Sequence, residues 1–597
     1  MKCYAFRVMS NQDLAKLLRN VAAAYTIKDE RKFHFQIVAY ENAAEMINGL
    51  TKEVNDYYKE GKLEEIPGIG VTLRARLEEL FRTGKVAQYE WALKDIPEAV
   101  FPLLDVPSFG PKKAYKLTTE FKLSNPKTVL NDLEKIAKAN KIASLKGFGE
   151  KSQADILQSI AEFRLGAGKT TRMTLPYAQE VADKIVEYMK TCKAVTEIEP
   201  LGSLRRQVST IGDIDLAASS NDPKTVLEHF SKYPYMERII EKGDVSSSIL
   251  TSGGKQIDLL VQPPERFGSL LQHFTGSKNH NVHLREVALR KGLSLSEYGI
   301  KYLKEKNQLT TAFDNEEKFY QAIGLTWIPP EIREDQGEIE AAEKNTLPKL
   351  VELQDVKGDL HLHSDYPIEP SHDLGKNSFE EIITKAQELG YEYVGFSEHN
   401  PSQAKHTPEK IYEILQKRSE KIEQIKSRIK NTRIFKLLET DILPNGNLAI
   451  DNKSLEILDA TIVSIHSVFN MNKNDMTKRV IAGLSHRKAK ILAHPTGRLL
   501  NQRPGYELDW EKLFEFCKKN NKALEINSWP DRLDLSDSII RLAVSADVKM
   551  VINTDSHATW QMDMMKYGVS MARRGWSTKN DILNTLSYNE FLDWLQK

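Results

Sequence analysis

The chain has 597 residues, too many for one hydrophobic core, so its length predicts several domains. No apolar run approaches the ~20 residues that a membrane-spanning helix needs, which excludes a membrane partner for the chain. The net charge of +1 excludes a globally basic surface, so any contact with nucleic acid must come from local patches. The first residues lack the basic-then-apolar order of a secretion signal, and Cys3, Cys192 and Cys517 form no CxxC pair. We therefore expect a cytoplasmic protein with no cysteine-held zinc.

Residues 11–165 are predicted to form short helices joined by glycine-containing turns. One turn pattern occurs three times, in LEEIPGIGVTLRARL (63–77), LLDVPSFGPKKAYKL (103–117) and IASLKGFGEKSQADI (142–156). Glycine in such a turn lets backbone N–H groups at a helix N-terminus approach a phosphate without reading a base. A single copy would equally fit a plain turn between two helices, whereas three copies resemble helix-hairpin-helix clamps on the DNA backbone. The predicted DNA-binding glycines are Gly68, Gly70, Gly110, Gly147 and Gly149, and Ser108 replaces the first glycine of the second copy.

From about Glu197 to Val261, short apolar runs predict strands, and two of these runs carry acidic residues. Alternation along a strand places Asp213 and Asp215, in GDIDL, on the same face. Two adjacent carboxylates would repel one another unless a cation lay between them, and Asp258, in QIDLLV, could complete a site for two Mg²⁺ ions. A lone DxD would equally fit surface polarity, but GSLRR upstream adds Ser203 and Arg206 as donors for a triphosphate.

These motifs resemble those of family X DNA polymerases over about residues 11–335. The resemblance implies that Asp213, Asp215 and Asp258 are the catalytic ligands of two Mg²⁺ ions. It implies gapped or primer-template DNA and dNTPs as partners, with the nucleotide bound by Gly202, Ser203, Arg206, Gly212, Phe274, Gly276, Asn281 and Arg285.

Two positions depart from the pattern of that family. His273 stands where many members have tyrosine, next to the loop that packs against the incoming sugar. Residues 1–85 resemble the small lyase domain of the family, but its Schiff-base lysine falls on Arg76. A guanidinium stays protonated and is a poor amine nucleophile, so we expect weak or absent lyase activity.

From Gly358 onward, β-like runs alternate with helical segments, which predicts a parallel α/β barrel or sheet. The runs end in His, Asp, Glu or Asn, so polar groups should gather at the carboxyl ends of the strands. Imidazoles and carboxylates without thiolates suit Mn²⁺, Zn²⁺ or Fe²⁺. The motifs are HLH (361–363), EH (398–399), Glu439, His466, His494 and DSH (555–557).

This set resembles the PHP family over about residues 357–580. The resemblance implies a seven-stranded β/α barrel that holds about three metal ions and hydrolyses phosphoesters. The implied ligands are His361, His363, His399, Glu439, His466, His494, Asp555 and His557. The segment HSDYPIEPSHD offers the ninth ligand, for which His372 is our choice, with Asp365 and Asp373 as alternatives.

The fold class expected from these patterns is multidomain. Its parts are a lyase-like helical domain (1–85), a fingers-type helical domain (86–165), an α+β nucleotidyltransferase palm (166–262), a thumb (263–335), a linker (336–356) and a (β/α)7 PHP barrel (357–597). A polymerase followed by a PHP domain resembles the bacterial and archaeal family X polymerases. That resemblance implies gap filling in DNA repair together with 3′–5′ exonuclease activity, carried out by a monomer. The alternatives are a PHP-type phosphatase or a DNA-end-binding scaffold, each with an inactive polymerase domain.

Overall fold

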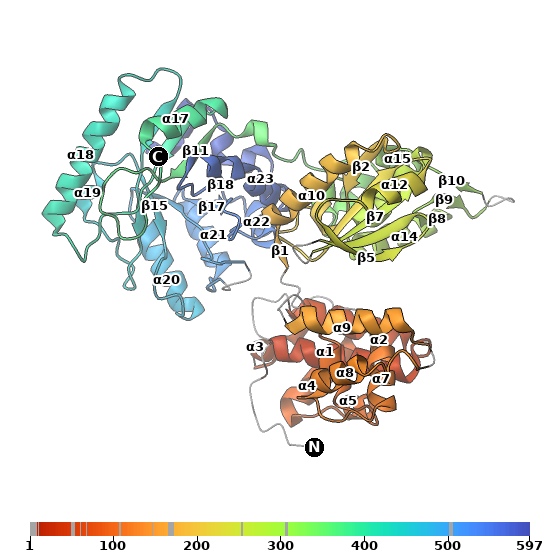
Figure 1. Cartoon of the computed structure of the whole chain (residues 1–597). Helices are drawn as coiled ribbons and strands as arrows, with labels where there is room; N and C mark the ends of the chain where they lie inside the picture. The colour runs from red at the N-terminus through yellow and green to blue at the C-terminus, as the bar shows by residue number, and fades with distance from the viewer. Residues whose placement is uncertain are drawn as a thin grey trace. The chain divides into compact units, whose positions relative to one another are not determined.

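The structure is a computed structural model that describes residues 9, 11–48, 54–59, 61–66, 69–106, 109–145, 147–164, 172–251, 255–304, 309–500 and 505–597. The chain divides into two compact units, Met1–Thr170 and Thr171–Lys597. Within the described residues the first unit is helical, and every strand belongs to the second (Figure 1). No helix in these ranges is both long and apolar enough to cross a membrane.

The first unit contains two hydrophobic cores, each built by consecutive helices. One core joins α1 (Asn11–Asp29), α2 (His34–Asn48), α3 (Val54–Lys59), α4 (Val71–Thr83) and α5 (Ala87–Leu93). The other joins α6 (Val100–Leu103), α7 (Pro111–Glu120), α8 (Val129–Lys138) and α9 (Glu150–Arg164). The short helices predicted for residues 11–165 are confirmed in the described part of this unit, and Leu14, Leu18 and Val21 of α1 are buried in the first core.

The second unit begins with a five-stranded mixed sheet of order β2-β4-β7-β6-β5. Its strands are β2 (Glu197–Pro200), β4 (Ile214–Ser219), β5 (Met236–Lys242), β6 (Ser246–Thr251) and β7 (Gln256–Gln262). Strands β4 and β7 are parallel and the other pairs are antiparallel. The sheet shares one core with α10 (Leu175–Lys190) and α12 (Pro223–Phe230). The short helix α11 (Gly202–Arg205) lies between β2 and the small strand β3 (Thr210–Ile211), which pairs with β1 (Met173–Thr174).

A smaller region of helices and short antiparallel strands follows the sheet. It comprises α13 (Phe267–Thr275), α14 (Lys278–Arg290), β8 (Leu293–Ser296), β9 (Gly299–Tyr302), β10 (Thr310–Thr311), α15 (Glu316–Ile323), the 3-10 turn η3 (Pro330–Ile332) and α16 (Glu338–Glu343). Phe319 and Tyr320 lie at its core, and Ile339 and Ala342 from the predicted linker pack into the same core.

The remainder of the unit is a β/α barrel. Its strands are β11 (Gly358–Leu362), β12 (Tyr393–Phe396), β13 (Arg433–Lys436), β14 (Glu439–Asp441), β15 (Thr461–Ser464), β16 (Ala489–Leu492), β17 (Ala523–Asn527) and β18 (Met550–Asn553), and all their pairings are parallel. Only Leu437 and Leu438 separate β13 from β14. Counted as one interrupted strand, they give the expected seven strands, and the bridge Leu362–Ser556 joins the end of the first strand to the residues just after the last.

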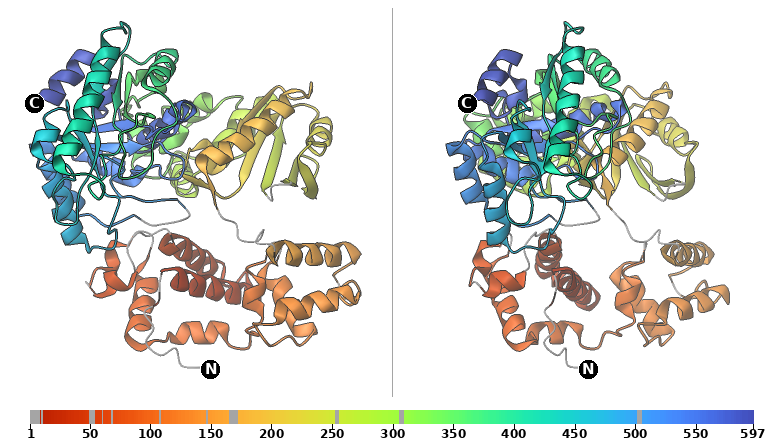
Figure 2. Two further views of the ribbon diagram at one scale, coloured as in Figure 1. Left: turned by 60° about the vertical axis from the view of Figure 1, so that its left-hand side comes forward. Right: turned by 90° about the vertical axis from the view of Figure 1, so that its left-hand side faces the viewer.

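Helices surround these strands on the outside (Figures 1 and 2). They are α17 (Phe379–Glu388), α18 (Pro408–Lys426), α19 (Asn452–Leu455), α20 (Lys473–Leu484), α21 (Trp510–Lys519), α22 (Asp537–Ser545), α23 (Met565–Arg574) and α24 (Tyr588–Gln596). The polar residues that end the strands therefore converge at one end of the barrel, as the sequence predicts.

Candidate functional sites

The parallel pair β4–β7 brings three carboxylates together. Asp215 and Asp258 are register partners on the two strands, and Asp213 lies immediately before β4. Ligand oxygens of the three side chains lie within 4.8 Å of one another. The Ser248 hydroxyl donates to Asp258, and the Gln256 amide lies 3.1 and 3.0 Å from its two oxygens. These bonds orient Asp258, and the resulting all-oxygen set is the kind that Mg²⁺ prefers.

The protonation of Asp215 reflects this crowding. Burial, followed by the charges of Asp213 and Asp258, raises the pKa of the Asp215 carboxyl to about 7. A divalent cation between the three groups would remove both the mutual repulsion and the cost of burying the charge. The electrostatics of the folded group would therefore favour a bound divalent cation.

Gly202 lets the helix α11 approach this acidic cluster. Its φ is +55°, and a Cβ at this position would lie 2.8 Å from Asp215 Oδ2. The Leu201 N–H also donates to the Asp215 carbonyl oxygen at 2.8 Å. The positive φ and the close packing against Asp215 therefore favour glycine at this position of the GS motif, and Ser203 lies in the same short helix, half-buried.

The two arginines of the GSLRR motif contact the segment that follows the sheet. Arg206 Nε lies 3.0 Å from Glu334 Oε1, and its Nη1 donates to the Thr275 carbonyl oxygen at 2.5 Å. A Cβ on Gly276 would lie 3.0 Å from the same Nη1, so Gly276 makes room for this guanidinium. Arg205 instead binds both oxygens of the buried Glu316, at 2.9 and 2.8 Å, a structural role that the sequence reading missed.

The other predicted nucleotide-site residues are placed as follows. Phe274 packs against the cluster that contains Leu201 and Ala217. The Asn281 amide donates to the His273 carbonyl oxygen at 2.6 Å, and burial lowers the pKa of the His273 imidazole. Arg285 is exposed on α14, and a Cβ on Gly212 would lie 3.3 Å from Arg172 Nη1.

In the first unit, glycines precede the second helix of each repeated turn. Gly70 and Gly110 are the N-caps of α4 and α7, Gly149 directly precedes α9, and Gly147 has a φ of +88°. A Cβ on Gly70, Gly110 or Gly149 would meet nothing within 4 Å, so no other part of the described structure packs against these glycines on that side. Gly68 and Ser108 lie outside the described residues.

Arg76, at the position expected for a lyase lysine, lies in α4 of the same unit. Its Nη1 donates to the Tyr40 hydroxyl, and its guanidinium also stands over the Tyr40 ring. Burial raises the pKa of Tyr40 to about 12, so the phenol stays neutral and accepts this bond.

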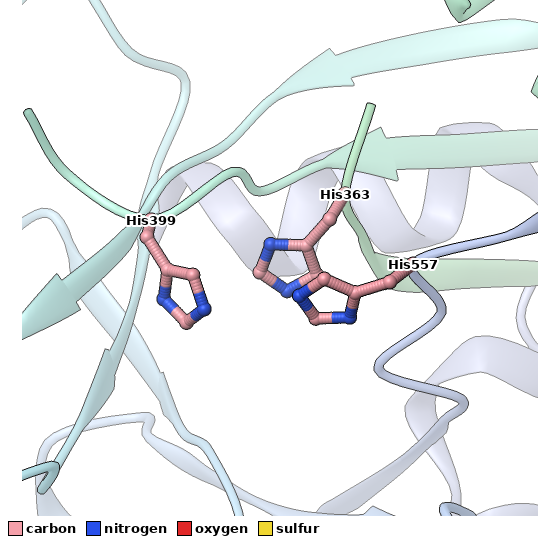
Figure 3. A group of neighbouring side chains, drawn as sticks. All are labelled: His363, His399 and His557. Carbon is pink, nitrogen blue, oxygen red and sulfur yellow. The ribbon is translucent and has the colours of Figure 1, made fainter. Parts of the chain in front are cut away.

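Glu439 occupies the centre of the histidine cluster at the end of the barrel. Its carboxylate oxygens lie 2.9 to 3.6 Å from ring nitrogens of His361, His363, His399, His466 and His494. Asp555 lies 3.5 and 3.2 Å from His361 and His363. The His363, His399 and His557 imidazoles point toward a common space (Figure 3). The structure thus brings all eight strand-end residues into one cluster.

The donor atoms of this cluster fit bound metal ions. Among the described residues, His361 Nε2, His363 Nδ1 and Nε2, His399 Nδ1, Glu439 Oε2 and His557 Nε2 are buried without a hydrogen-bond partner. Several unsatisfied polar atoms in one buried place would be costly in a protein without a ligand there. Divalent cations that accept nitrogen and oxygen ligands would satisfy them together.

Besides His363, the HSDYPIEPSHD segment brings His372 and Asp373 to the cluster. His372 Nε2 lies 3.4 Å from Asp441 Oδ2 and forms a possible ligand group with Asp441 and His466. Asp373 lies 3.3 Å from His399 and 3.5 Å from His557, whereas Asp365 is exposed. Asp441 was missed in the sequence, although its ExD spacing from Glu439 on one strand is a usable signal.

The chain is 33% identical over 592 residues to the DNA polymerase/3'-5' exonuclease PolX of Bacillus subtilis (strain 168), covering 99% of this chain and 100% of that relative. This chain belongs to the family X DNA polymerases that carry a PHP domain. The family descriptions that match are helix-hairpin-helix domain (residues 9–86), DNA polymerase beta thumb (270–334) and PHP domain (359–529).

Two further relatives each match a part of this family X polymerase. DNA polymerase lambda of Rattus norvegicus is 22% identical over 311 residues, about half of each chain. A probable phosphatase of Syntrophotalea carbinolica is 24% identical over 173 residues, which cover 28% of this chain and 65% of the relative. The multidomain fold class expected from the sequence is confirmed.

In this PHP domain, carboxylates behind the cluster hold the ligands in place. Glu525 Oε1 lies 2.7 Å from His361 Nδ1, and its Oε2 accepts from the His494 N–H at 2.7 Å. Burial opposes a charge on His361, but Glu525, Asp555 and Glu439 outweigh it and raise its pKa. Glu398, which precedes His399, binds the buried Arg418 instead of facing the cluster ligands. Fixing the far ring nitrogen directs His361 Nε2 into the cluster.

Proposed function

We propose that this family X polymerase fills short gaps in DNA during repair and removes 3′-terminal nucleotides with its PHP domain. The observation that carries the proposal is the presence of two separate clusters in one chain, each with donor atoms that could hold divalent cations. One is the carboxylate set on β4 and β7, and the other is the histidine-rich set at the end of the barrel. Neither cluster shares a residue with the other, so each activity can be removed by itself.

For synthesis, Asp213, Asp215 and Asp258 would hold two Mg²⁺ ions, which neutralise the charge that develops as the phosphoryl group is transferred. Gly202, Ser203, Arg206 and Gly212 would bind the triphosphate. Phe274 and Gly276 would contact the sugar of the incoming nucleotide, and Asn281 and Arg285 the nascent base pair. The proximity of α11, Gly276 and the acidic cluster supports this assignment.

For degradation, the PHP ligands would be His361, His363, His372, His399, Glu439, His466, His494, Asp555 and His557. They would hold about three ions, with Mn²⁺, Zn²⁺ or Fe²⁺ as candidates, which supply a nucleophile at neutral pH and stabilise charge on the phosphoester. Asp441 and Asp373 are further candidate ligands, because both contact predicted ligands. Arg532 Nε lies 3.7 Å from Asp555 Oδ2 and would interact with a phosphate bound beside the cluster.

The helical first unit would hold DNA through the glycine turns at Gly68, Gly70, Gly110, Gly147 and Gly149, with Arg76 leaving little lyase activity. We further propose the domain boundaries given by the sequence, a cytoplasmic location and a monomeric state. A phosphatase with an inactive polymerase domain is the second candidate, favoured only by the similarity of the barrel to probable phosphatases. The three assembled aspartates oppose it.

A labelled DNA duplex with a one-nucleotide gap tests the proposal. With dNTP and Mg²⁺, the gap primer should be extended by one nucleotide. Without dNTP and in Mn²⁺, it should be shortened from its 3′ end. Binding without either reaction would support a scaffold and overturn the proposal, whereas phosphate release from small phosphoesters without extension would support the phosphatase.

A further inference from the structure

One arginine of the PHP domain reaches into the nucleotide site proposed for the polymerase. Arg574 ends α23 and is buried, with 5% of its side chain exposed. Its Nη1 lies 2.7 Å from the backbone carbonyl oxygen of Arg206 and 3.0 Å from Glu334 Oε1. Three hundred and sixty-eight positions separate Arg574 from Arg206 along the chain, so this contact joins two domains of the second unit.

Glu334 is shared between the two arginines. Its Oε1 accepts from Arg206 Nε at 3.0 Å and from Arg574 Nη1 at 3.0 Å. The Arg206 guanidinium is further held by the Thr275 carbonyl oxygen through Nη1. The contacts found in the described residues use Nε and Nη1, so the Nη2 end of Arg206 remains for a triphosphate oxygen.

On its other side, Arg574 is anchored within the PHP domain. Its Nε and Nη2 lie 2.8 and 2.5 Å from Asp537 Oδ2, at the first turn of α22. A buried guanidinium is stable only when its donors are satisfied, and here the acceptors come from both domains. Because α22 and α23 pack against one another, Arg574 has little freedom to follow a moving polymerase side chain.

We propose that Arg574 is a positioning residue of the polymerase nucleotide site, acting through Glu334 and the backbone of Arg206. The inference rests on the proposed function, because it takes Arg206 to be a ligand of the triphosphate. Arg574 fixes the carbonyl at the end of the GSLRR segment and the carboxylate that orients the Arg206 side chain. The PHP domain thereby completes the binding site for the incoming nucleotide in addition to degrading DNA ends.

The neighbouring residue provides a matched control. Arg573 also joins the domains, with Nε 2.7 Å from Glu331 Oε1 and Nη1 3.1 Å from the Val351 carbonyl oxygen. Neither contact involves Arg206 or Glu334. Arg573→Lys therefore weakens the same domain contact by the same chemical change, without disturbing the proposed positioning of Arg206.

The test is steady-state gap filling by the full-length protein with varied dNTP. Arg574→Lys keeps a positive charge next to Asp537 but loses the planar guanidinium that also bonds to Glu334 and the Arg206 carbonyl. It should therefore raise the KM for dNTP about tenfold, the size expected for the loss of one charge-assisted hydrogen bond. Its kcat should stay within about twofold, because the catalytic carboxylates are untouched. Glu334→Gln should raise the same KM, and the double variant should add little, since both changes disrupt one network. The 3′ exonuclease rate on single-stranded DNA should match the wild type and report a folded PHP domain.

Two outcomes would overturn the inference. Equal increases of KM in Arg574→Lys and Arg573→Lys would show that only docking of the domains matters. An unchanged KM in both Arg574→Lys and Glu334→Gln would remove the positioning role, provided that Arg206→Ala raises KM. An unchanged KM in Arg206→Ala would instead show that the nucleotide role assigned to Arg206 in the proposed function is wrong.

Discussion

Asp215 and Asp258 are directly paired across two neighbouring parallel strands, with their carboxylates on the same face of the sheet. Parallel pairing at this point leaves no freedom to separate the two charges, because each is fixed by the backbone of its strand. The carboxylates therefore repel one another, and a cation bound between them would relieve this repulsion.

Asp215→Asn should abolish gap filling and leave 3′ degradation at the wild-type rate. The amide removes a charged metal ligand, and losses of two to three orders of magnitude or more are expected for such a group. Primer extension and shortening on the same gapped duplex give both rates. Asp244→Asn, at an exposed carboxylate between β5 and β6, is the control. Gap filling that persists at full rate in Asp215→Asn would show that the metal site is elsewhere.

The Mg²⁺ requirement of synthesis should depend on pH. The pKa of Asp215 is about 7, so below that pH a proton must leave before the metal can bind. The half-saturating Mg²⁺ concentration should rise up to about tenfold for each pH unit below 7 and level off above about pH 8. Gap-filling rates over a Mg²⁺ series at several pH values measure it.

The raised pKa of Asp215 also makes the stability of the fold depend on pH. Asp215 binds a proton more tightly in the folded protein than in the unfolded chain, so its stabilising contribution to the free energy of unfolding is complete below the unfolded pKa. This contribution is lost as the pH rises through about 7, and Mg²⁺ should restore the stability.

For the prediction on synthesis, a half-saturating Mg²⁺ concentration that is constant between about pH 6 and 8 would contradict the assignment of Asp215 as a metal ligand.

Glu439→Gln should lose exonuclease activity and bound metal together. The carboxylate contacts five imidazoles, so its neutralisation leaves cations in the cluster without a shared counter-charge. Elemental analysis and 3′ shortening of the full-length variant measure the two losses. Glu413→Gln, on the exposed face of α18, should change neither. Because Mn²⁺ accepts mixed nitrogen and oxygen ligands more readily than Mg²⁺, the wild-type exonuclease should prefer Mn²⁺. Full exonuclease activity in a metal-free protein would refute this centre.

Borohydride should trap little covalent adduct between the wild-type protein and DNA with a 5′-deoxyribose phosphate end. Arg76 cannot supply a neutral amine, whereas Arg76→Lys would place a primary amine, which can lose its proton, next to Tyr40. Trapping should therefore increase several-fold in Arg76→Lys, at unchanged affinity for the gapped DNA. Strong wild-type trapping that disappears when an N-terminal lysine is replaced would show that another residue forms the Schiff base.

Gly70→Asp should separate helix stability from DNA binding. The N-cap carboxylate would accept hydrogen bonds from N–H groups in the first turn of α4 and stabilise the helix by a few tenths of a kcal/mol. The same charge would repel a DNA phosphate, so the Kd for gapped DNA should rise several-fold at low salt. Gly70→Ser caps without charge and should have the smaller effect on DNA binding. Equal affinities of the wild type and Gly70→Asp would mean that this turn does not contact phosphate.

Local patterns predicted the two clusters of candidate metal ligands because these residues lie in short motifs at strand ends. Alternation alone placed Asp213 with Asp215 and His361 with His363, and the structure confirms that both pairs converge. Asp441 obeys the same alternation and could have been found from it.

Contacts made over long sequence distances could not be predicted in this way. Glu334 and Arg574 are 240 positions apart, and neither belongs to a motif that carries chemistry. Their partnership depends on how two domains pack, which no periodicity encodes. The interruption of one barrel strand between Lys436 and Glu439 was likewise hidden, because both halves continue the same apolar run.

Glycines in this chain will differ sharply in a saturation library. At Gly202, a Cβ would lie 2.8 Å from a carboxylate oxygen and the backbone is left-handed, so amino-acid substitutions at this position should be depleted under selection for synthesis. At Gly110, where the added atom meets open space, substitutions should survive selection for folding. Sequencing alone can thus distinguish the glycines whose replacement impairs the proposed catalytic centre from those whose replacement changes DNA binding.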